Sequence, residues 1–177
     1  DSYYALANEM HKLGYKEDEL TAAFLAARSK RSPDKIFDIF RNRVVIPIID
    51  VRGNVIAFGG RVLDDSKPKY LNTSDTPVFK KTNGLFALNF AKSSKDNSLI
   101  LCEGYMDVIA LHQAGFTNAV AALGTSFTED HARLVARYAS EAILVFDADA
   151  AGQKGAQRAI SLLRQTGVHI RVVTIPN

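Results

Sequence analysis

Four short apolar runs alternate with stretches of helical periodicity in the second half of the chain, and this pattern constrains the fold more than any other feature. The apolar runs are residues 99–102, 118–123, 142–146 and 169–175, and the helical stretches are residues 105–114, 127–139 and 151–166. Short apolar runs bounded by turn residues are typical of buried strands. Strands that alternate with helices form a parallel sheet with right-handed crossovers. We therefore predict an α/β fold here, with a parallel sheet flanked by helices.

Acidic residues follow two of these predicted strands, at the point where each strand ends. Glu103 and Asp107 come after the first strand, and Asp147 and Asp149 come after the third. Ligands of an open parallel sheet bind outside the carboxyl ends of its strands, where the strand order reverses. A strand order of 2-1-3-4 makes these two ends neighbours. We therefore expect the four carboxylates to converge.

Four converging carboxylates cannot all stay ionised without compensation. Hard divalent cations supply it, and Mg²⁺ is usually held by one or two carboxylates and several waters. Two such ions about 3.5–4 Å apart stabilise both ends of a phosphoryl displacement. The pattern therefore predicts a site for Mg²⁺ or Mn²⁺. The competing interpretation is that the four acids cap helices or lie in solvated loops. A receiver-type phosphoacceptor module is disfavoured, because no lysine follows Lys154.

The first half of the chain predicts a smaller α+β subdomain. Helical patterns cover residues 3–13, 18–27, 36–40 and 85–91. Residues 43–51 and 55–62 are β-rich and flank a short turn, which predicts a hairpin. Pro47 favours an edge position or a bulge for the first of these strands, because proline cannot donate to a sheet ladder.

Charge is distributed unevenly along the chain. Residues 28–95 hold fourteen basic and six acidic side chains, net +8, whereas residues 1–27 hold two and five, net −3, and residues 96–177 hold six and eight, net −2. A basic stretch beside an acidic site suggests a polyanionic partner together with bound cations. A solvated surface rich in Lys and Arg is the competing interpretation.

The polar linker around residues 93–98 predicts a boundary between domains 1–95 and 96–177.

The cysteine content and the lengths of the apolar runs indicate the cellular compartment. A single cysteine, Cys102, excludes a disulfide within the chain and a zinc ribbon. No apolar run approaches the ~20 residues needed to span a bilayer, and no secretory signal is visible. We expect a protein of a reducing cytoplasm with no membrane partner.

Three sequence motifs carry a resemblance to a known module. The motifs EGYMDVIAL at residues 103–111, ALGTSFTEDH at 122–131 and FDADAAG at 146–152 resemble the Toprim module. Bacterial primases, type IA and type II topoisomerases and some nucleases share this module. The sequence EGYMD is most similar to the corresponding motif of bacterial DnaG-type primases. RNRVVIPIIDVRGNVIAFGGRVL at 41–63 and PKYLN at 68–72 resemble the basic subdomain of the same primases.

The resemblance implies a nucleotidyltransferase that makes short RNA primers from ribonucleoside triphosphates on a single-stranded DNA template. By position, the metal ligands are Glu103, Asp147 and Asp149, with Asp107 in a supporting catalytic role. The residues that contact template and nucleotide phosphates are implied to be Arg41, Arg43, Arg61, Lys69 and Asn72. The implied mechanism is nucleotidyl transfer assisted by two Mg²⁺ or Mn²⁺ ions.

The resemblance also implies that the chain is a fragment of a catalytic core. The zinc-binding module of the family is missing, so zinc is expected only there. A further acidic motif is expected after Asn177, and the region that binds the replicative helicase is missing too. We expect this fragment to be a monomer with little or no activity by itself.

Two alternatives stay open from the sequence. One is another Toprim enzyme, a topoisomerase or a nuclease, although nothing marks any of the tyrosines as a nucleophile. The other is a non-catalytic nucleic-acid-binding module whose acidic site is vestigial. A titration with divalent ions separates this second alternative from an enzyme, because a vestigial site binds no metal.

Overall fold

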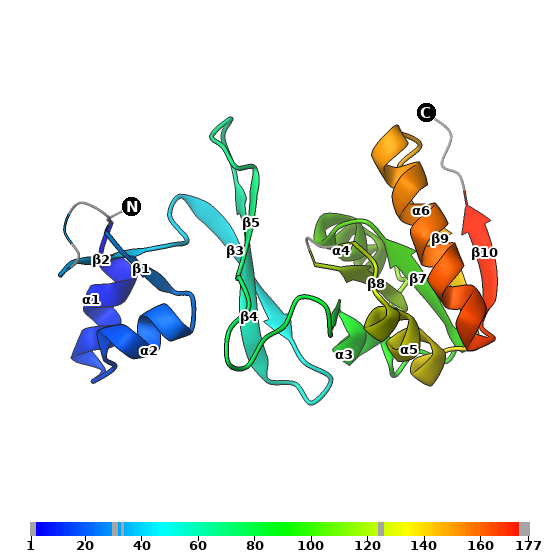
Figure 1. Cartoon of the computed structure of the whole chain (residues 1–177), viewed down its shortest axis with the longest axis horizontal. Coiled ribbons are helices and arrows are strands. Elements are labelled where there is room, and N and C mark those ends of the chain that lie inside the picture. Colours follow the sequence, from blue (N-terminus) through cyan, green and yellow to red (C-terminus); the bar gives the residue numbers. More distant parts are fainter. Residues whose placement is uncertain (1–2, 30–31, 33, 124–125, 174–177) are drawn as a thin grey trace. The chain divides into compact units, whose positions relative to one another are not determined.

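The computed structural model describes residues 3–29, 32, 34–123 and 126–173 (Figure 1). The chain forms two compact units. One unit comprises Asp1–Ile48 and Val55–Phe79, and the other comprises Ile49–Asn54 and Lys80–Asn177. The division into domains 1–95 and 96–177 stays a prediction. No helix in the described part of the chain is long and apolar enough to cross a membrane.

A five-stranded sheet forms the centre of the second unit. Its strands are β6 Leu85–Phe86, β7 Ser98–Cys102, β8 Ala119–Ala122, β9 Glu141–Val145 and β10 His169–Val173. The strand order is β10-β9-β7-β8-β6. Strands β7 to β10 are parallel, whereas β6 pairs antiparallel with β8. The four parallel strands thus have the predicted order 2-1-3-4, and the predicted α/β fold is confirmed.

Helices cover this sheet. They are α3 Leu88–Ala91, α4 Tyr105–Gln113, α5 Glu129–Tyr138 and α6 Ala150–Leu163, which a 3₁₀ turn Arg164–Thr166 extends. Helices α5 and α6 pack against each other, and Figure 1 shows α6, in orange, alongside β9 and β10. Right-handed crossovers put α4 on the opposite face, because the chain moves in the opposite direction between β7 and β8. Between sheet and helices lie fully buried side chains that include Leu99, Leu101, Val120, Val135, Leu144 and Leu163.

The first unit combines a small helical part with a three-stranded sheet. Its elements are α1 Ala5–Lys12, α2 Glu17–Ala22, β1 Ala26–Arg28, β2 Ile36–Asp38, β3 Arg43–Ile49, β4 Val55–Val62 and β5 Tyr70–Asn72. Strands β3, β4 and β5 form a sheet in that order. Strand β3 with Pro47 therefore lies at an edge, as the proline predicts. The buried carboxylate of Asp38 accepts hydrogen bonds from the backbone N of Leu6 at 2.7 Å and Ala7 at 2.9 Å.

Short strands in this half of the chain were not predictable, and three expectations are wrong. The helix expected over residues 18–27 ends at Ala22, and Phe24 has a positive φ of 57°. Residues 36–40 do not form a helical turn, because β2 pairs antiparallel with β1. Residues 85–91 are not one helix, because Ala87, with φ 64°, separates β6 from α3.

In the sequence, Ser126 and Glu129 have the spacing of a capping box, but the box that begins α5 in the structure is formed by other residues. The N-cap is Thr128, whose side chain accepts from the backbone N of His131, and the His131 side chain accepts from the backbone N of Thr128. The box is therefore shifted by two residues, and a histidine takes the place of the glutamate.

Candidate functional site

The ends of β7 and β9 bring Glu103 and Asp147 together. The two strands pair in register as far as Cys102 and Val145, so the residues after them leave the sheet at the same edge. Glu103 Oε1 accepts a hydrogen bond from the backbone N of Asp147 at 2.8 Å. The expected meeting of the two acidic strand ends is therefore present in the structure, whereas the role of these residues stays a prediction.

The other two acids each begin a helix. Asp107 lies in the first turn of α4, where its Oδ2 accepts from the backbone N of Gly104 at 3.1 Å. Asp149 is the N-cap of α6, and its Oδ1 accepts from the backbone N of Gly152 at 2.8 Å. Both carboxylates thus satisfy backbone amides that a helix leaves without a partner. Helix capping and a role at the strand ends are compatible, because each contact uses one of two carboxylate oxygens.

The four carboxylates influence one another electrostatically. Burial raises the pKa of Glu103, the hydrogen bond from the Asp147 backbone opposes this shift, and the charges of Asp147, Asp149 and Asp107 add to it. Like charges therefore gather at this edge of the sheet. Among the described residues, no three His, Cys, Asp or Glu side chains already form a metal-binding arrangement.

The donor set nevertheless fits a hard divalent cation. All four side chains offer carboxylate oxygen, the ligand that Mg²⁺ and Mn²⁺ prefer. Glu103, Asp107 and Asp149 each use one oxygen for a backbone amide. The second oxygen of each makes no hydrogen bond to the described part of the chain. A cation would also offset the mutual repulsion that raises the pKa of Glu103.

Gly152 makes the contact between Glu103 and Asp147 possible. A Cβ atom at residue 152 would lie 2.3 Å from Glu103 Oε1 and 2.3 Å from the carbonyl O of Asp147. Real Cβ atoms essentially never come so close. The group that approaches the backbone of Gly152 most closely, together with the Asp147 carbonyl, is therefore the Glu103 side chain.

A cavity of about 170 Å³ adjoins Glu103. Its lining includes Cys102, Phe127, Phe146 and Gly155. Burial, with a smaller contribution from Asp107, raises the pKa of Cys102 to about 12, so the thiol stays protonated and unreactive. Cys102 is thus the buried apolar residue that the sequence predicts.

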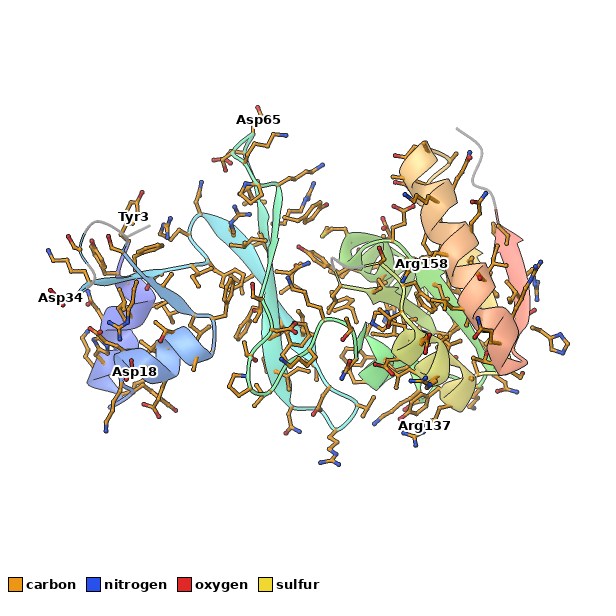
Figure 2. The ribbon with its side chains drawn as sticks, viewed as in Figure 1. Tyr3, Asp18, Asp34, Asp65, Arg137 and Arg158 are labelled. Carbon is orange, nitrogen blue, oxygen red and sulfur yellow. The ribbon has the colours of Figure 1, made fainter. Side chains whose placement is uncertain are left out.

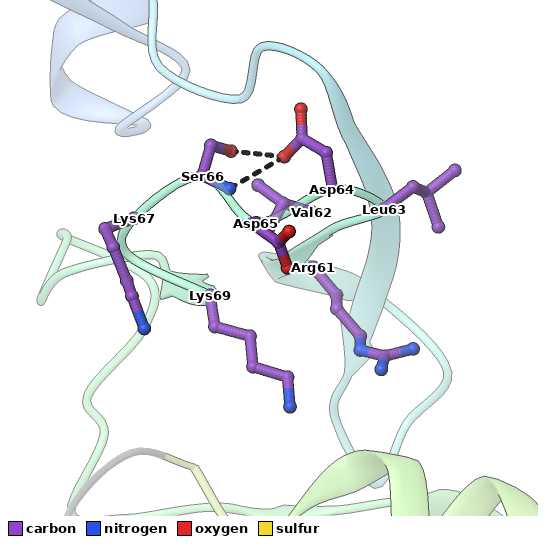
Figure 3. A pocket seen from close by; sticks show the side chains of 8 residues that line it. All are labelled: Arg61, Val62, Leu63, Asp64, Asp65, Ser66, Lys67 and Lys69. Atoms are coloured by element: carbon purple, nitrogen blue, oxygen red, sulfur yellow. Dashed lines mark hydrogen bonds between the residues drawn. The ribbon is translucent and has the colours of Figure 1, made fainter.

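Three of the predicted phosphate-binding residues come together on the sheet of the first unit. Arg43 lies on β3, Arg61 on β4, and Lys69 immediately before β5. One guanidinium nitrogen of Arg43 donates to the carbonyl O of Lys69 at 3.4 Å. Arg61 and Lys69 line a cavity of about 610 Å³. We call this cavity, with Arg43 beside it, the basic groove. Figure 3 shows the cationic ends of Arg61, Lys67 and Lys69 on one side and the carboxylate of Asp64 on the other.

Two buried polar atoms near the basic groove have no partner in the described structure. They are Nε of Arg61 and Oδ1 of Asn72. The guanidinium of Arg61 lies 5.9 Å from the ring centroid of Tyr70, and the Lys69 ammonium lies 5.8 Å from the same ring. Sequence reasoning did not assign Tyr70 a role, although it stands between lysine and asparagine in KPKYLN. An exposed aromatic ring between cations is typical of surfaces on which nucleic-acid bases stack.

Arg41 does not join this groove. Its guanidinium lies 4.4 Å from the ring centroid of Tyr3 and 5.1 Å from that of Phe37, and it donates to the carbonyl O of Asp38. Arg41 lines a different cavity, of about 420 Å³. The five residues predicted to line one groove therefore divide between two places in the first unit.

Two family models match the chain. Residues 1–92 match the family "DNA primase catalytic core, N-terminal domain". This chain belongs to the DNA primase catalytic core family. Residues 97–174 match the Toprim domain, so the parallel sheet with its acidic strand ends is the Toprim domain of a primase-family chain.

Individual relatives agree with this assignment. A DNA primase from Clostridium acetobutylicum is 47% identical over 178 residues, which cover 100% of this chain but 29% of that primase. The solved E. coli primase catalytic core has a TM-score of 0.89 and 36% identity, and the match covers 99% of this chain and 57% of that chain. A DnaG primase catalytic domain bound to ssDNA has a TM-score of 0.87 and 36% identity, covering 99% of this chain and 56% of that chain. The chain therefore spans less than a third of the Clostridium primase.

Proposed function

We propose that this chain is part of the catalytic core of a DNA primase, a DNA-directed RNA polymerase that makes short RNA primers on single-stranded DNA for replication. The observation that carries the proposal is the meeting of Glu103 and Asp147 at the ends of two neighbouring parallel strands. The match of residues 1–92 to the primase family supports it.

In this proposal Glu103, Asp147 and Asp149 hold Mg²⁺ or Mn²⁺, and Asp107 supports them. Bound ions of this kind lower the pKa of a primer 3′-hydroxyl and neutralise triphosphate charge. The backbone of Asp147 orients Glu103 through the 2.8 Å hydrogen bond. The backbone of Gly152 orients Asp149 in the same way. Backbone amides thus fix two of the proposed ligands before any ion arrives.

The basic residues contact the phosphates in this proposal. Arg43, Arg61, Lys69 and Asn72 bind template and nucleotide phosphates, and Arg41 adds a contact at its separate place. Arginine and lysine also stabilise the pyrophosphate leaving group. The position of Arg61 and Lys69 on the lining of one cavity supports this assignment. Phosphate contacts of this kind hold a template with little reading of its sequence.

The proposed partners follow from the same assignment. They are single-stranded DNA, ribonucleoside triphosphates and, through a region outside this chain, the replicative helicase in a primosome. The ssDNA-bound DnaG relative supports the first of these. We propose a monomer that acts at the replication fork in the bacterial cytoplasm, with zinc bound only by a module outside this chain.

The two alternatives are affected differently by the structure. The match of residues 1–92 to primases disfavours a topoisomerase or nuclease. A non-catalytic nucleic-acid-binding module is favoured by one observation, since no three acidic, histidine or cysteine side chains among the described residues form a ready metal site. Measured ion binding discriminates between this module and an enzyme.

The first test measures Mn²⁺ binding. The unchanged chain should bind Mn²⁺ weakly, and Asp147→Asn or Asp149→Asn should weaken binding at least about tenfold, because few carboxylates hold the ion. Asp96→Asn removes an exposed acid outside the strand ends and is the matched control. Equal Mn²⁺ affinity for all four proteins, or no binding by any, would contradict the proposed metal site.

The second test measures binding to single-stranded DNA at several salt concentrations. Arg43→Ala and Lys69→Ala should each weaken binding and reduce the salt slope by about 1, as expected for one lost phosphate contact. Lys12→Ala removes an exposed lysine of α1 that pairs with Glu9 at 3.0 Å and serves as the control. An unchanged slope in both groove variants would count against the basic groove as a DNA site.

A further inference from the structure

His131 is fully buried in α5, although no motif in the sequence marks it. Its exposed fraction is 0%. Its ring lies 5.5 Å from the ring of Phe127, measured between centroids. Phe127 lines the cavity that also touches Glu103. A buried imidazole this close to the acidic strand ends requires a physical explanation.

Both ring nitrogens of His131 have backbone partners. Nδ1 accepts a hydrogen bond from the backbone N of Thr128 at 3.2 Å. Nε2 lies 3.2 Å from the carbonyl O of Lys81, and the carbonyl of Gly84 also hydrogen-bonds the ring. A backbone N–H only donates and a carbonyl only accepts, so the ring must be neutral with its proton on Nε2. Burial also lowers the pKa of His131, which favours this neutral form.

Thr128 holds the same segment as His131. Its hydroxyl donates to the carbonyl O of Thr82 at 2.9 Å and accepts from the backbone N of His131 at 3.2 Å. The N-cap of α5 and the first-turn histidine therefore fix successive carbonyls of residues 80–84, which we call the KKTNG segment. This segment carries two lysines of the basic stretch.

The neighbouring loop is anchored from the other side. Arg158 of α6, labelled in Figure 2, donates from Nε to the carbonyl O of Phe127 at 2.7 Å. The loop that leads into α5 is thus held between α6 and the KKTNG segment.

We propose that His131 is a positioning residue that locks the KKTNG segment against α5 and so presents its lysines to polyanionic substrate. The use of these lysines rests on the proposed function. The lock itself rests only on the contacts of His131 and Thr128, so the two parts can fail separately.

Two substitutions separate the two contacts of the ring. His131→Gln places an amide donor near the position of Nε2 and can still hold Lys81 O. His131→Asn places a carbonyl oxygen near the position of Nδ1 but provides no donor that reaches the segment. Thr128→Ser keeps the hydroxyl and serves as the control.

Trypsin reports on the lock, because a segment released from α5 enters the protease more readily, and cleavage after Lys80 and Lys81 should then be faster. We expect His131→Asn to be cleaved there roughly three to ten times faster than the unchanged chain, as for loss of one hydrogen bond. His131→Gln and Thr128→Ser should be cleaved close to the original rate. Cleavage after other basic residues reports global unfolding. In His131→Asn, the rate of cleavage after Lys80 and Lys81 must therefore increase more than the rate at those other residues. Equal rates for His131→Asn and His131→Gln, or no change in either, would overturn the lock.

The unchanged chain provides a check that does not depend on folding of the variants. Imidazole ¹⁵N spectra should show the neutral ring with its proton on Nε2 at pH 7, and the other tautomer or a charged ring would overturn the proposal. Binding to a dT oligonucleotide then tests the functional part. His131→Asn should reduce DNA affinity, because the released segment no longer holds its lysines in place. It should leave Mn²⁺ affinity unchanged. If the unchanged chain does not bind the oligonucleotide, the proposed function fails while the lock is still judged by trypsin and NMR.

Discussion

The Glu103 carboxylate lies so close to the backbone of Asp147 and Gly152 that a methyl group added at residue 152 would displace it. Its Oε1 accepts from the backbone of Asp147, and the Cα of Gly152 lies where no side chain fits. The sequence indicates which acids gather at the strand ends, because Glu103 and Asp147 directly follow two short apolar runs that predict buried strands. It does not show that each carboxylate is tied to a particular amide, because such contacts depend on side-chain rotamers and on the exact approach of two strand ends.

We expect Gly152→Ala to disturb the acidic site far more than Gly155→Ala. The new Cβ at residue 152 would meet Glu103 Oε1 and the Asp147 carbonyl at 2.3 Å, whereas at residue 155 it would meet the Phe146 ring at 3.3 Å. Overpacking of this kind costs about 1–3 kcal/mol, and Mn²⁺ binding should be lost with it. Thermal unfolding and Mn²⁺ titration of both variants check this. Equal behaviour of the two would show that the site tolerates a side chain at residue 152.

We expect Glu103→Gln to stabilise the ion-free chain and to remove its response to Mn²⁺. The pKa of Glu103 is raised in the folded state, so its contribution to stability is present at acidic pH and is lost as pH rises through that value. At neutral pH the charge therefore costs stability, and glutamine still accepts from Asp147. The gain should be below about 1 kcal/mol, because Glu103 is only partly buried and solvent screens its charge. Melting curves with chelator and with Mn²⁺ measure both effects. A lower melting temperature with chelator would contradict this reasoning.

At the scale of elements, long periodic segments were predictable and short ones were not. Helix α4 and strands β4, β7 and β9 lie within two residues of their expected bounds. Strands β1 and β2 have three residues and β6 has two, too few to show a period of their own. Tertiary pairing decides such segments. Arg41 lies apart from the basic groove, because it follows β2 directly and its guanidinium packs against Tyr3 and Phe37.

The histidine at the start of α5 should make stability depend on pH. Burial lowers the pKa of His131 below 6.5, with the Lys81 and Gly84 carbonyls and the charge of Asp130 opposing this shift. The unfolded chain therefore binds this proton more readily. The contribution of His131 to stability is complete above about pH 6.5 and is lost as pH falls toward the folded-state pKa. Urea unfolding from pH 5 to 8 should show this slope, and His131→Gln should flatten it. The same slope in the variant would assign it to other groups.

At the scale of the whole molecule, the chain matches primase catalytic cores along nearly all of its length but spans 29% of the Clostridium acetobutylicum primase. Residues of such a primase outside the matched part can add carboxylates to the few that this chain offers to a cation, and Mg²⁺ in particular depends on substrate phosphates for its remaining ligands. Activity is therefore expected to depend on more than the four acids described here.

We expect the chain by itself to fold, to bind Mn²⁺ weakly and to make little or no primer, because two-ion transfer loses its clamp when one ion is poorly held. A longer version that continues past Asn177 should make more. Primer synthesis on single-stranded template with nucleotides and Mn²⁺ compares the two, with Asp147→Asn in the longer version as a negative control. Equal synthesis by both lengths would show that Glu103, Asp107, Asp147 and Asp149 suffice.

The hydrogen bond from Asp147 to Glu103 also gives the molecule a built-in spectroscopic reporter. A backbone amide proton that points at a carboxylate resonates at an unusual frequency, and this frequency changes when the carboxylate gains a proton or is drawn toward a cation. The amide signal of Asp147 therefore records the charge state of Glu103 directly, with no label and no turnover. Acid, metal and substrate phosphate can each be followed at the same proton.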